Sequence, residues 1–148
     1  MQLTKHTDFS LRVLIYLALQ APEQRVTNSE IAEQFAIPKN HLIKVVHELG
    51  KLGYIVTIRG KGGGILLKMP ANTINIAKVI QDMEPTLELI NCEKPICPLL
   101  PSCALIGVLA QARTAFIDVL AQYTLADLIK QPETMEHLIQ WRPATNDA

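Results

Sequence analysis

The chain has 148 residues, enough for one domain with a hydrophobic core of its own. Hydrophobic residues make up 49% and charged residues 19%, which excludes a disordered or fibrous chain. Three cysteines cannot all pair within one chain, so a disulfide-stapled mini-protein is excluded too. The apolar runs 13–19 and 104–110 are far shorter than the roughly 18 residues of a membrane span. Asp8 and Arg12 argue against a cleaved signal peptide, so we expect a cytoplasmic protein without a membrane partner.

The net charge of zero hides an uneven distribution along the chain. The first 68 residues carry nine basic and five acidic side chains, a net charge of +4, and the remainder carries −4. Positive charge concentrated in half of a small protein favours a polyanionic partner such as a nucleic acid. Chance segregation of charge is the alternative.

The first third of the chain predicts helices separated by short turns. Apolar residues recur at helical spacing from 7 to 20, and Pro22 follows. Residues 27–30 (TNSE) form a capping box, with a hydroxyl at the start of a short helix and a carboxylate three residues later. A tight turn at residues 36–37 precedes Pro38, which opens another helix because its missing N–H is not needed there.

The pattern then changes from helix to strand. Residues 54–58 and 65–67 predict two short strands joined by the glycine-rich turn 60–64, a β-hairpin with a basic tip. Two helices around a tight turn, followed by such a hairpin, are typical of a winged helix-turn-helix. We therefore assign residues 1–70 to a DNA-binding domain of this type.

The rest of the chain divides into four parts. Residues 71–84 form a linking helix, and the proline-rich loop 85–103 holds all three cysteines. Residues 104–130 comprise a long helix and a short capped helix, and 131–148 form a C-terminal tail that we expect to be mobile from Pro143. We therefore predict a mainly α chain with a small β-hairpin: a winged helix-turn-helix domain plus a long dimerisation helix.

The long helix, expected from Cys103 to Tyr123, carries apolar residues at alternating steps of four and three. This spacing is the heptad pattern of a helix that pairs with a second helix. Packing of this helix against its own winged domain is the alternative. The seam consists of Leu105, Leu109, Ala112, Phe116, Val119 and Tyr123.

Candidate DNA contacts lie on the second helix of the motif and on the hairpin. The N-terminal end of a recognition helix enters the major groove, where lysine suits phosphate or guanine and asparagine suits adenine. Arginine is favoured in narrow minor grooves, and a helix N-terminus can hold a phosphate. The predicted DNA contacts are Asn28, Ser29, Lys39, Asn40, His41, Lys44, Arg59 and Lys61. The alternative is a solvated basic surface on a protein–protein module.

The cysteines follow the spacing Cys92-x4-Cys97-x5-Cys103. A spacing of two residues would suggest a zinc knuckle, whereas these wider gaps suit an iron–sulfur cluster, in which each thiolate reaches a different iron. Such clusters usually have four ligands, so another residue type or another chain must supply the fourth. Asp8 is one candidate, with a helix cap or dipole partner as its alternative role. Redox-active thiols and structural thiols are the alternatives for the cysteines.

Several motifs together resemble a known family. They are MQLT at the N-terminus, TDFSLR at 7–12, RGKGGGI at 59–65, the cysteine spacing, IQDMEP at 80–85 and YTLADL at 123–128. Across about residues 1–130, this set resembles the Rrf-two-type winged-helix regulators, in particular their nitric-oxide-sensing repressors. The resemblance implies a homodimer with one iron–sulfur cluster per subunit, either 4Fe–4S or 2Fe–2S. Its ligands would be residues matching Cys92, Cys97 and Cys103, with Asp8 of the partner subunit as the fourth.

The resemblance also implies a function. It predicts a transcriptional repressor, not an enzyme, that binds a pseudo-palindromic operator and releases it when nitric oxide reacts with the cluster. Ile106 stands where a related regulator of cluster assembly has histidine, which argues against that subtype. The alternatives are an iron–sulfur regulator that responds to iron or oxidative signals, an electron-transfer protein and a zinc-stabilised winged-helix module.

Overall fold

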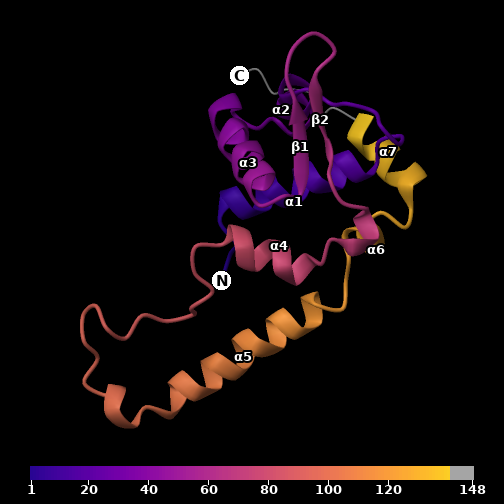
Figure 1. The fold of residues 1–148 in the computed structure, drawn as a ribbon. Helices are drawn as coiled ribbons and strands as arrows, with labels where there is room; N and C mark the ends of the chain where they lie inside the picture. Colours follow the sequence, from indigo (N-terminus) through magenta and orange to yellow (C-terminus); the bar gives the residue numbers. More distant parts are fainter. Residues whose placement is uncertain (141–148) are drawn as a thin grey trace, which may run out of the picture.

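The structure is a computed structural model that describes residues 1–140, so the expected mobility from Pro143 lies outside the described residues. The prediction of a mainly helical chain with a small β-hairpin is confirmed (Figure 1). The elements in chain order are α1 (Lys5–Ala18), α2 (Asn28–Phe35), α3 (Lys39–Lys51), β1 (Ile55–Ile58), β2 (Gly64–Leu67), η1 (Ala71–Thr73), α4 (Ile76–Met83), η2 (Leu100–Ser102), α5 (Ala104–Leu120), α6 (Leu125–Leu128) and α7 (Pro132–Gln140).

Helix α1 begins and ends two residues earlier than predicted. Thr4 is its N-cap, because the Thr4 side-chain oxygen accepts a hydrogen bond from the Thr7 amide at 3.3 Å. Asp8, considered above as a possible cap, therefore lies within the first turn, where a negative charge still stabilises the helix dipole. The helix ends before Pro22 because a residue that precedes proline is disfavoured in the helical conformation.

Helices α2 and α3 form the helix-turn-helix. The predicted capping box is confirmed: Thr27 accepts from the Glu30 amide at 3.2 Å, and the Glu30 carboxylate accepts from the Thr27 amide at 2.6 Å. Ala36 ends α2 in the left-handed conformation, with φ of 51°. Pro38 is the N-cap of α3, so this helix begins where the sequence predicted.

Strands β1 and β2 and the turn between them form a two-stranded antiparallel wing. A Cβ atom on Gly63 would lie 2.2 Å from the carbonyl oxygen of Ile58, so the turn admits only glycine there. The guanidinium of Arg25 donates to the Gly62 carbonyl oxygen at 2.7 Å and fastens the tip of the wing to the rest of the domain. The register pairs Ile55 with Leu67, Val56 with Leu66, Thr57 with Ile65 and Ile58 with Gly64.

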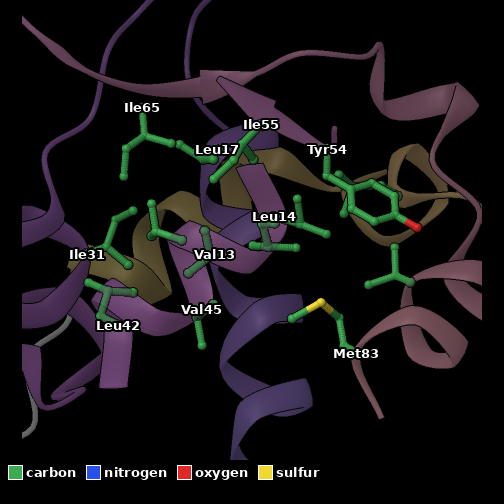
Figure 2. Packing of buried hydrophobic residues seen from close by; sticks show 14 of the residues in the cluster. Val13, Leu14, Leu17, Ile31, Leu42, Val45, Tyr54, Ile55, Ile65 and Met83 are labelled. Carbon is green, nitrogen blue, oxygen red and sulfur yellow. The ribbon is translucent and has the colours of Figure 1, made fainter. Parts of the chain in front are cut away.

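One hydrophobic core holds the winged domain together (Figure 2). It draws buried side chains from α1, α2, α3 and both strands, and also from α4, which was expected as a linking helix. Tyr54, at the root of the wing, donates from its hydroxyl to Asp82 of α4 at 2.6 Å. Burial and this neighbouring carboxylate raise the pKa of Tyr54, so the hydroxyl keeps its proton and the link persists.

The chain returns to this core after α5. The Leu125 amide donates to the Ile74 carbonyl at 2.8 Å, and the Ile76 amide donates to the Tyr123 carbonyl at 3.0 Å. Thr124 and Asp127 form a second capping box that starts α6, as the sequence predicted. Leu125 is fully buried in the same core, so α6 closes the domain from the far end of the sequence.

Residues 85–120 form an arm that projects from this domain (Figure 1). In the part of the chain that the structure describes, no residue of α5 is buried. The alternative that α5 packs against its own winged domain therefore applies only to its C-terminal end, where Leu120 packs against the core and α5 contacts α4. Helix α5 ends at Leu120, so Tyr123, predicted as the last seam residue, lies in the turn beyond it.

The C-terminal tail is not featureless within residues 131–140. It contains α7, although the helical pattern there was weak in the sequence. None of the helices in residues 1–140 combines the length and apolar character needed to cross a bilayer.

Candidate DNA interface and cysteine centre

The predicted contacts on α3 lie on one exposed surface. Lys39, Asn40, His41 and Lys44 are all exposed in the first two turns of the helix. The opposite face of α3 is buried, which fixes how the helix presents this surface. The Oδ1 atom of Asn40 accepts a hydrogen bond from the His41 amide at 3.0 Å and thereby satisfies one amide at the helix start. The face carries cationic and hydrogen-bonding groups suited to phosphates and base edges.

A groove of about 490 Å³ lies between α3 and the wing. Arg59 lines it from the wing, and Asn28 lines it from the start of α2. Lys61 is exposed on the wing turn and Ser29 is exposed on α2, and neither is among the described residues that line the groove. The predicted contacts therefore comprise the exposed start of α3, two groove residues and two flanking residues.

Sequence reasoning missed several residues of this surface. Ile43 is 56% exposed although it is a large apolar residue in an amphipathic helix. It could have been found from the sequence, because it lies one position from the buried Leu42 and so off the buried face. An exposed aliphatic side chain on a recognition helix suits contact with a thymine methyl group. The other residues of the groove that were not predicted include His47, Lys51, Thr57 and Lys68.

The three cysteines lie together on the loop that leads into α5, and all are free and partly exposed. The Cys97 amide donates to the Cys92 carbonyl at 2.9 Å, which closes the segment between them into a hairpin. The Leu100 amide donates to the Cys97 carbonyl at 3.1 Å and starts the next turn. Cys103 is the N-cap of α5, and its side chain makes no capping hydrogen bond within the described residues.

The electrostatics of the loop suit a bound cation. Partial burial, together with the nearby Cys97 and Cys103 thiols, raises the pKa of Cys92. Three thiolates in one loop therefore repel one another unless a positive centre binds them. The unsatisfied amides at the start of α5 favour negative charge at Cys103.

These residues fit an iron–sulfur cluster in donor type but do not form a finished single-ion site. Among residues 1–140, no three histidine, cysteine or acidic side chains are gathered where one metal ion could bind them. A cluster differs from a single ion because each thiolate can bind a different iron atom. The loop offers three thiolates, so a fourth ligand must come from elsewhere.

Asp8 lies in the first turn of α1, in the winged domain, and is not gathered with the cysteines of its own chain among the described residues. Its side chain is 42% exposed and forms an ion pair with Arg12 at 2.9 Å, one turn later on α1. An exposed ion pair of this kind contributes little to stability, so Asp8 can exchange partners at small cost. The structure thus keeps this carboxylate available at the surface but does not bring it to the loop.

The chain matches the model of one protein family. The Rrf2 family, described as iron-dependent transcriptional regulators, matches residues 3–131. The chain belongs to the Rrf2 family. It is therefore a transcriptional regulator and not an enzyme. The winged helix-turn-helix and the exposed face of α3 are the parts of this Rrf2 protein that suit DNA.

Similar proteins agree with this assignment. An HTH-type transcriptional regulator NsrR from Shouchella clausii is 46% identical over 145 residues, which cover 96% of this chain and 97% of that protein. Another NsrR, from Bacillus subtilis, is 44% identical over 145 residues, with coverage of 96% and 99%. Full-length similarity at this level shows that the chain shares the whole architecture of these regulators.

Solved structures confirm the fold class. T. potens IscR superposes with a TM-score of 0.73 at 21% identity, covering 97% of this chain and 93% of IscR. CymR, the global cysteine regulator of B. subtilis, gives a TM-score of 0.67 at 23% identity, with coverage of 86% and 95%. At such low identity the likeness extends to the fold alone.

Proposed function

We propose that this Rrf2 protein is a homodimeric repressor that binds a pseudo-palindromic DNA operator and senses nitric oxide through one iron–sulfur cluster per subunit. The observation that carries the proposal is the position of the three free thiols. They lie at the head of α5, an apolar helix that has no buried residue within the described chain. The sensing group and the dimer interface would therefore be built on the same arm.

The exposed apolar surface of α5 supports a homodimer. Val108 and Val119 are 59% and 55% exposed in the single chain, and Leu105 is 52% exposed. Burying such side chains contributes about 25 cal/mol per Å² of apolar surface. Pairing with α5 of a second copy would cover them, and the heptad spacing suits that arrangement. We assign residues 104–130 to the dimerisation region.

A symmetric dimer presents two recognition helices. In such dimers the two helices enter successive major grooves about 34 Å apart, so the operator repeats as a pseudo-palindrome. Lys39, Asn40, His41 and Lys44 on α3 would read the major groove. Arg59 and Lys61 on the wing would enter the adjacent minor groove. Asn28 and Ser29 would hold a phosphate at the start of α2.

The cysteine loop supplies the ligands for the cluster. Cys92, Cys97 and Cys103 would hold it, and Asp8 of the partner subunit would be the fourth ligand. When bound, the cluster supplies iron that reacts with nitric oxide. Holding Asp8 would draw the winged domain of one subunit toward the loop of the other. The ligand set would therefore fix the two recognition helices at one spacing.

The expected role follows from this arrangement. A repressor that loses operator affinity on exposure to nitric oxide would control genes for nitric oxide detoxification. Such a protein acts in the cytoplasm, where its DNA target lies. A difference in operator affinity of about 100-fold, or about 3 kcal/mol, is enough for such a switch.

The test is an anaerobic visible spectrum of the purified protein during a titration with nitric oxide, with operator binding followed in parallel. We expect coloured protein that bleaches and releases the operator at a few equivalents of nitric oxide per chain. Cys97→Ala should lose the visible absorption and the bound iron but still dimerise. The form of the spectrum distinguishes a 4Fe–4S from a 2Fe–2S cluster.

Two outcomes would overturn the proposal. If the purified protein were colourless and contained zinc, it would be a zinc-stabilised winged-helix regulator instead. A cluster that is unaffected by nitric oxide but bleached by oxygen or peroxide would leave an iron–sulfur regulator of oxidative signals.

A further inference from the structure

We propose that the first turn of α1 transmits the state of the cysteine loop to the recognition helix, with Glu84 and Phe9 as positioning residues at its two ends. Glu84 clamps the turn to the base of the loop, and Phe9 contacts α3. The inference rests on the proposed function, because it explains how a change at the loop reaches the DNA-binding face.

Glu84 lies at the junction between the core and the arm. It is the C-cap of α4 and the last residue before the segment that leads to the cysteines. Its carboxylate accepts hydrogen bonds from the Thr4 amide and the Thr4 hydroxyl, both at 3.1 Å, and from the Thr7 hydroxyl. These contacts join residues about 80 positions apart in the chain. Glu84 therefore ties the base of the loop directly to the start of α1.

Glu84 binds the N-terminal end of α1, where the first backbone amides lack partners within the helix. Thr4 is the N-cap of the helix, and a carboxylate beside a helix N-terminus stabilises the unsatisfied amides of the first turn. Thr7 is completely buried, so its hydroxyl has no water to replace a lost partner. Displacing Glu84 would leave the buried Thr7 hydroxyl with only the Thr4 hydroxyl, at 3.1 Å, as its recorded partner, and would remove the carboxylate that stabilises the first turn.

Consecutive residues of this turn engage different parts of the molecule. Thr7 bonds to Glu84 at the loop base, and Asp8 pairs with Arg12 at the surface. The ring of Phe9 lies 6.5 Å from the ring of His41, measured between centroids. His41 is in the first turn of α3, at the end that would enter the major groove in the proposed function.

A shift of the turn must therefore move the start of α3. Helix α1 packs against both α3 and α4, so the turn lies between the recognition helix and the loop base. Phe9 is partly buried and packs against the core, which limits how far it can move without displacing its neighbours. Release of Glu84 would change where Phe9 holds His41, and the α3 surface would no longer match its DNA groove.

The test compares Glu84→Ala, Thr7→Val and Phe9→Ala with the control Glu88→Ala. Glu88 is exposed and lies four residues after Glu84, in the irregular segment beyond α4, so its removal changes the charge equally without affecting the clamp. Two quantities are measured on the full chain. One is the hydrogen-exchange rate of the amides in residues 8–12, and the other is the ratio of operator affinities with and without the cluster. Visible absorption confirms that each variant carries the same amount of cluster.

We expect Glu84→Ala and Thr7→Val to speed amide exchange in residues 8–12 by about tenfold. Phe9→Ala should leave that exchange unchanged. All three should bring the affinity ratio to within about threefold of one, and Glu88→Ala should behave as wild type. Thr7→Val is close in shape to the original residue, so it decides the question if Glu84→Ala fails to fold.

If both Glu84→Ala and Thr7→Val kept the wild-type amide-exchange rates, the proposal that Glu84 holds the first turn of α1 would be wrong. If Phe9→Ala kept the wild-type ratio of operator affinities with and without the cluster, the proposal that Phe9 transmits the change to α3 would be wrong. If the wild-type protein itself bound the operator equally well with and without the cluster, the proposed function would fail instead, and the exchange rates would still show whether Glu84 holds the turn.

Discussion

The winged domain and the arm differ in where their stability comes from. Every buried hydrophobic side chain among the described residues lies either before residue 84 or at Leu125. The arm between them is comparably apolar in sequence but exposes large side chains such as Ile96 and Leu99, at 77% and 67%. The winged domain therefore folds around its own core, whereas the arm has apolar surface that none of the residues 1–140 covers.

The comparison teaches how the proposed sensing and DNA-binding roles are divided. A self-sufficient core keeps the recognition helix ordered whatever the state of the loop. In the proposed function, an arm that pairs with a second subunit and binds a cluster can change without unfolding the domain. Glu84 stands where the arm leaves the domain, and there it accepts hydrogen bonds from Thr4 and Thr7.

The largest effect should come from damaging the core. Leu14 is fully buried in the centre of the cluster, so Leu14→Ala should lower the free energy of unfolding by about 3–4 kcal/mol. Urea denaturation of the cluster-free protein measures this. Ile96→Ala on the arm is the control and should change stability by less than about 0.5 kcal/mol. Equal losses from the two variants would contradict the division between core and arm.

The next largest effect should separate the subunits without unfolding them. Leu109 lies in the predicted seam of α5, so Leu109→Asp should weaken dimerisation by at least about 100-fold, because it would bury an unpaired charge. Sedimentation velocity over a concentration series measures the association, and circular dichroism should show an unchanged winged domain. Gln111→Asp adds the same charge outside the seam and should leave the dimer intact. Dissociation by both variants would argue against the seam.

A moderate effect is expected at the wing. Arg59→Ala should weaken operator binding by about tenfold and lower the slope of log affinity against log salt by about one. Fluorescence anisotropy at several salt concentrations measures both. Lys130→Ala removes the same charge just beyond α6 and should change neither. If Arg59→Ala left the slope of log affinity against log salt unchanged, the wing would not be part of the DNA interface.

The smallest effect concerns the capping box that docks α6. Hydrogen bonds from Lys130 and from Thr124 lower the pKa of Asp127 to about 2. Because the pKa is depressed only in the folded state, the stabilisation is present above about pH 4 and is lost as the pH falls toward 2. Asp127→Asn should therefore lose less stability than wild type between pH 5 and pH 3 in denaturant titrations. Asp118→Asn on α5 should follow the wild-type pH dependence.

Local signals in the sequence were sufficient to predict the winged helix-turn-helix motif. The capping boxes at Thr27 and Thr124 and the turn before Pro38 each depend on residues within four positions of one another, so a linear pattern contains them. The wing was equally clear, because its tip admits only glycine at Gly63. The start of α1 was misplaced because its cap is reinforced by Glu84, a residue distant in sequence.

The candidate site was predicted unevenly for the same reason. Sequence position alone placed Cys92, Cys97 and Cys103 on one loop, and the helix-turn-helix pattern together with residue type pointed to the start of α3. The groove between α3 and the wing, with Ile43 and Lys68 on its walls, requires two elements to lie side by side, which no local pattern expresses.

The sequence by itself thus determined the elements, the family motifs and the chemistry of the side chains, because these depend on residue type and on spacing along the chain. Only the tertiary structure decided which apolar surfaces are covered. It placed α4 and Leu125 in the core, left α5 without a buried residue among those described, and joined Glu84 to Thr7. The physical reason is that burial and long-range hydrogen bonds depend on the relative positions of elements, which are set by packing of the whole chain.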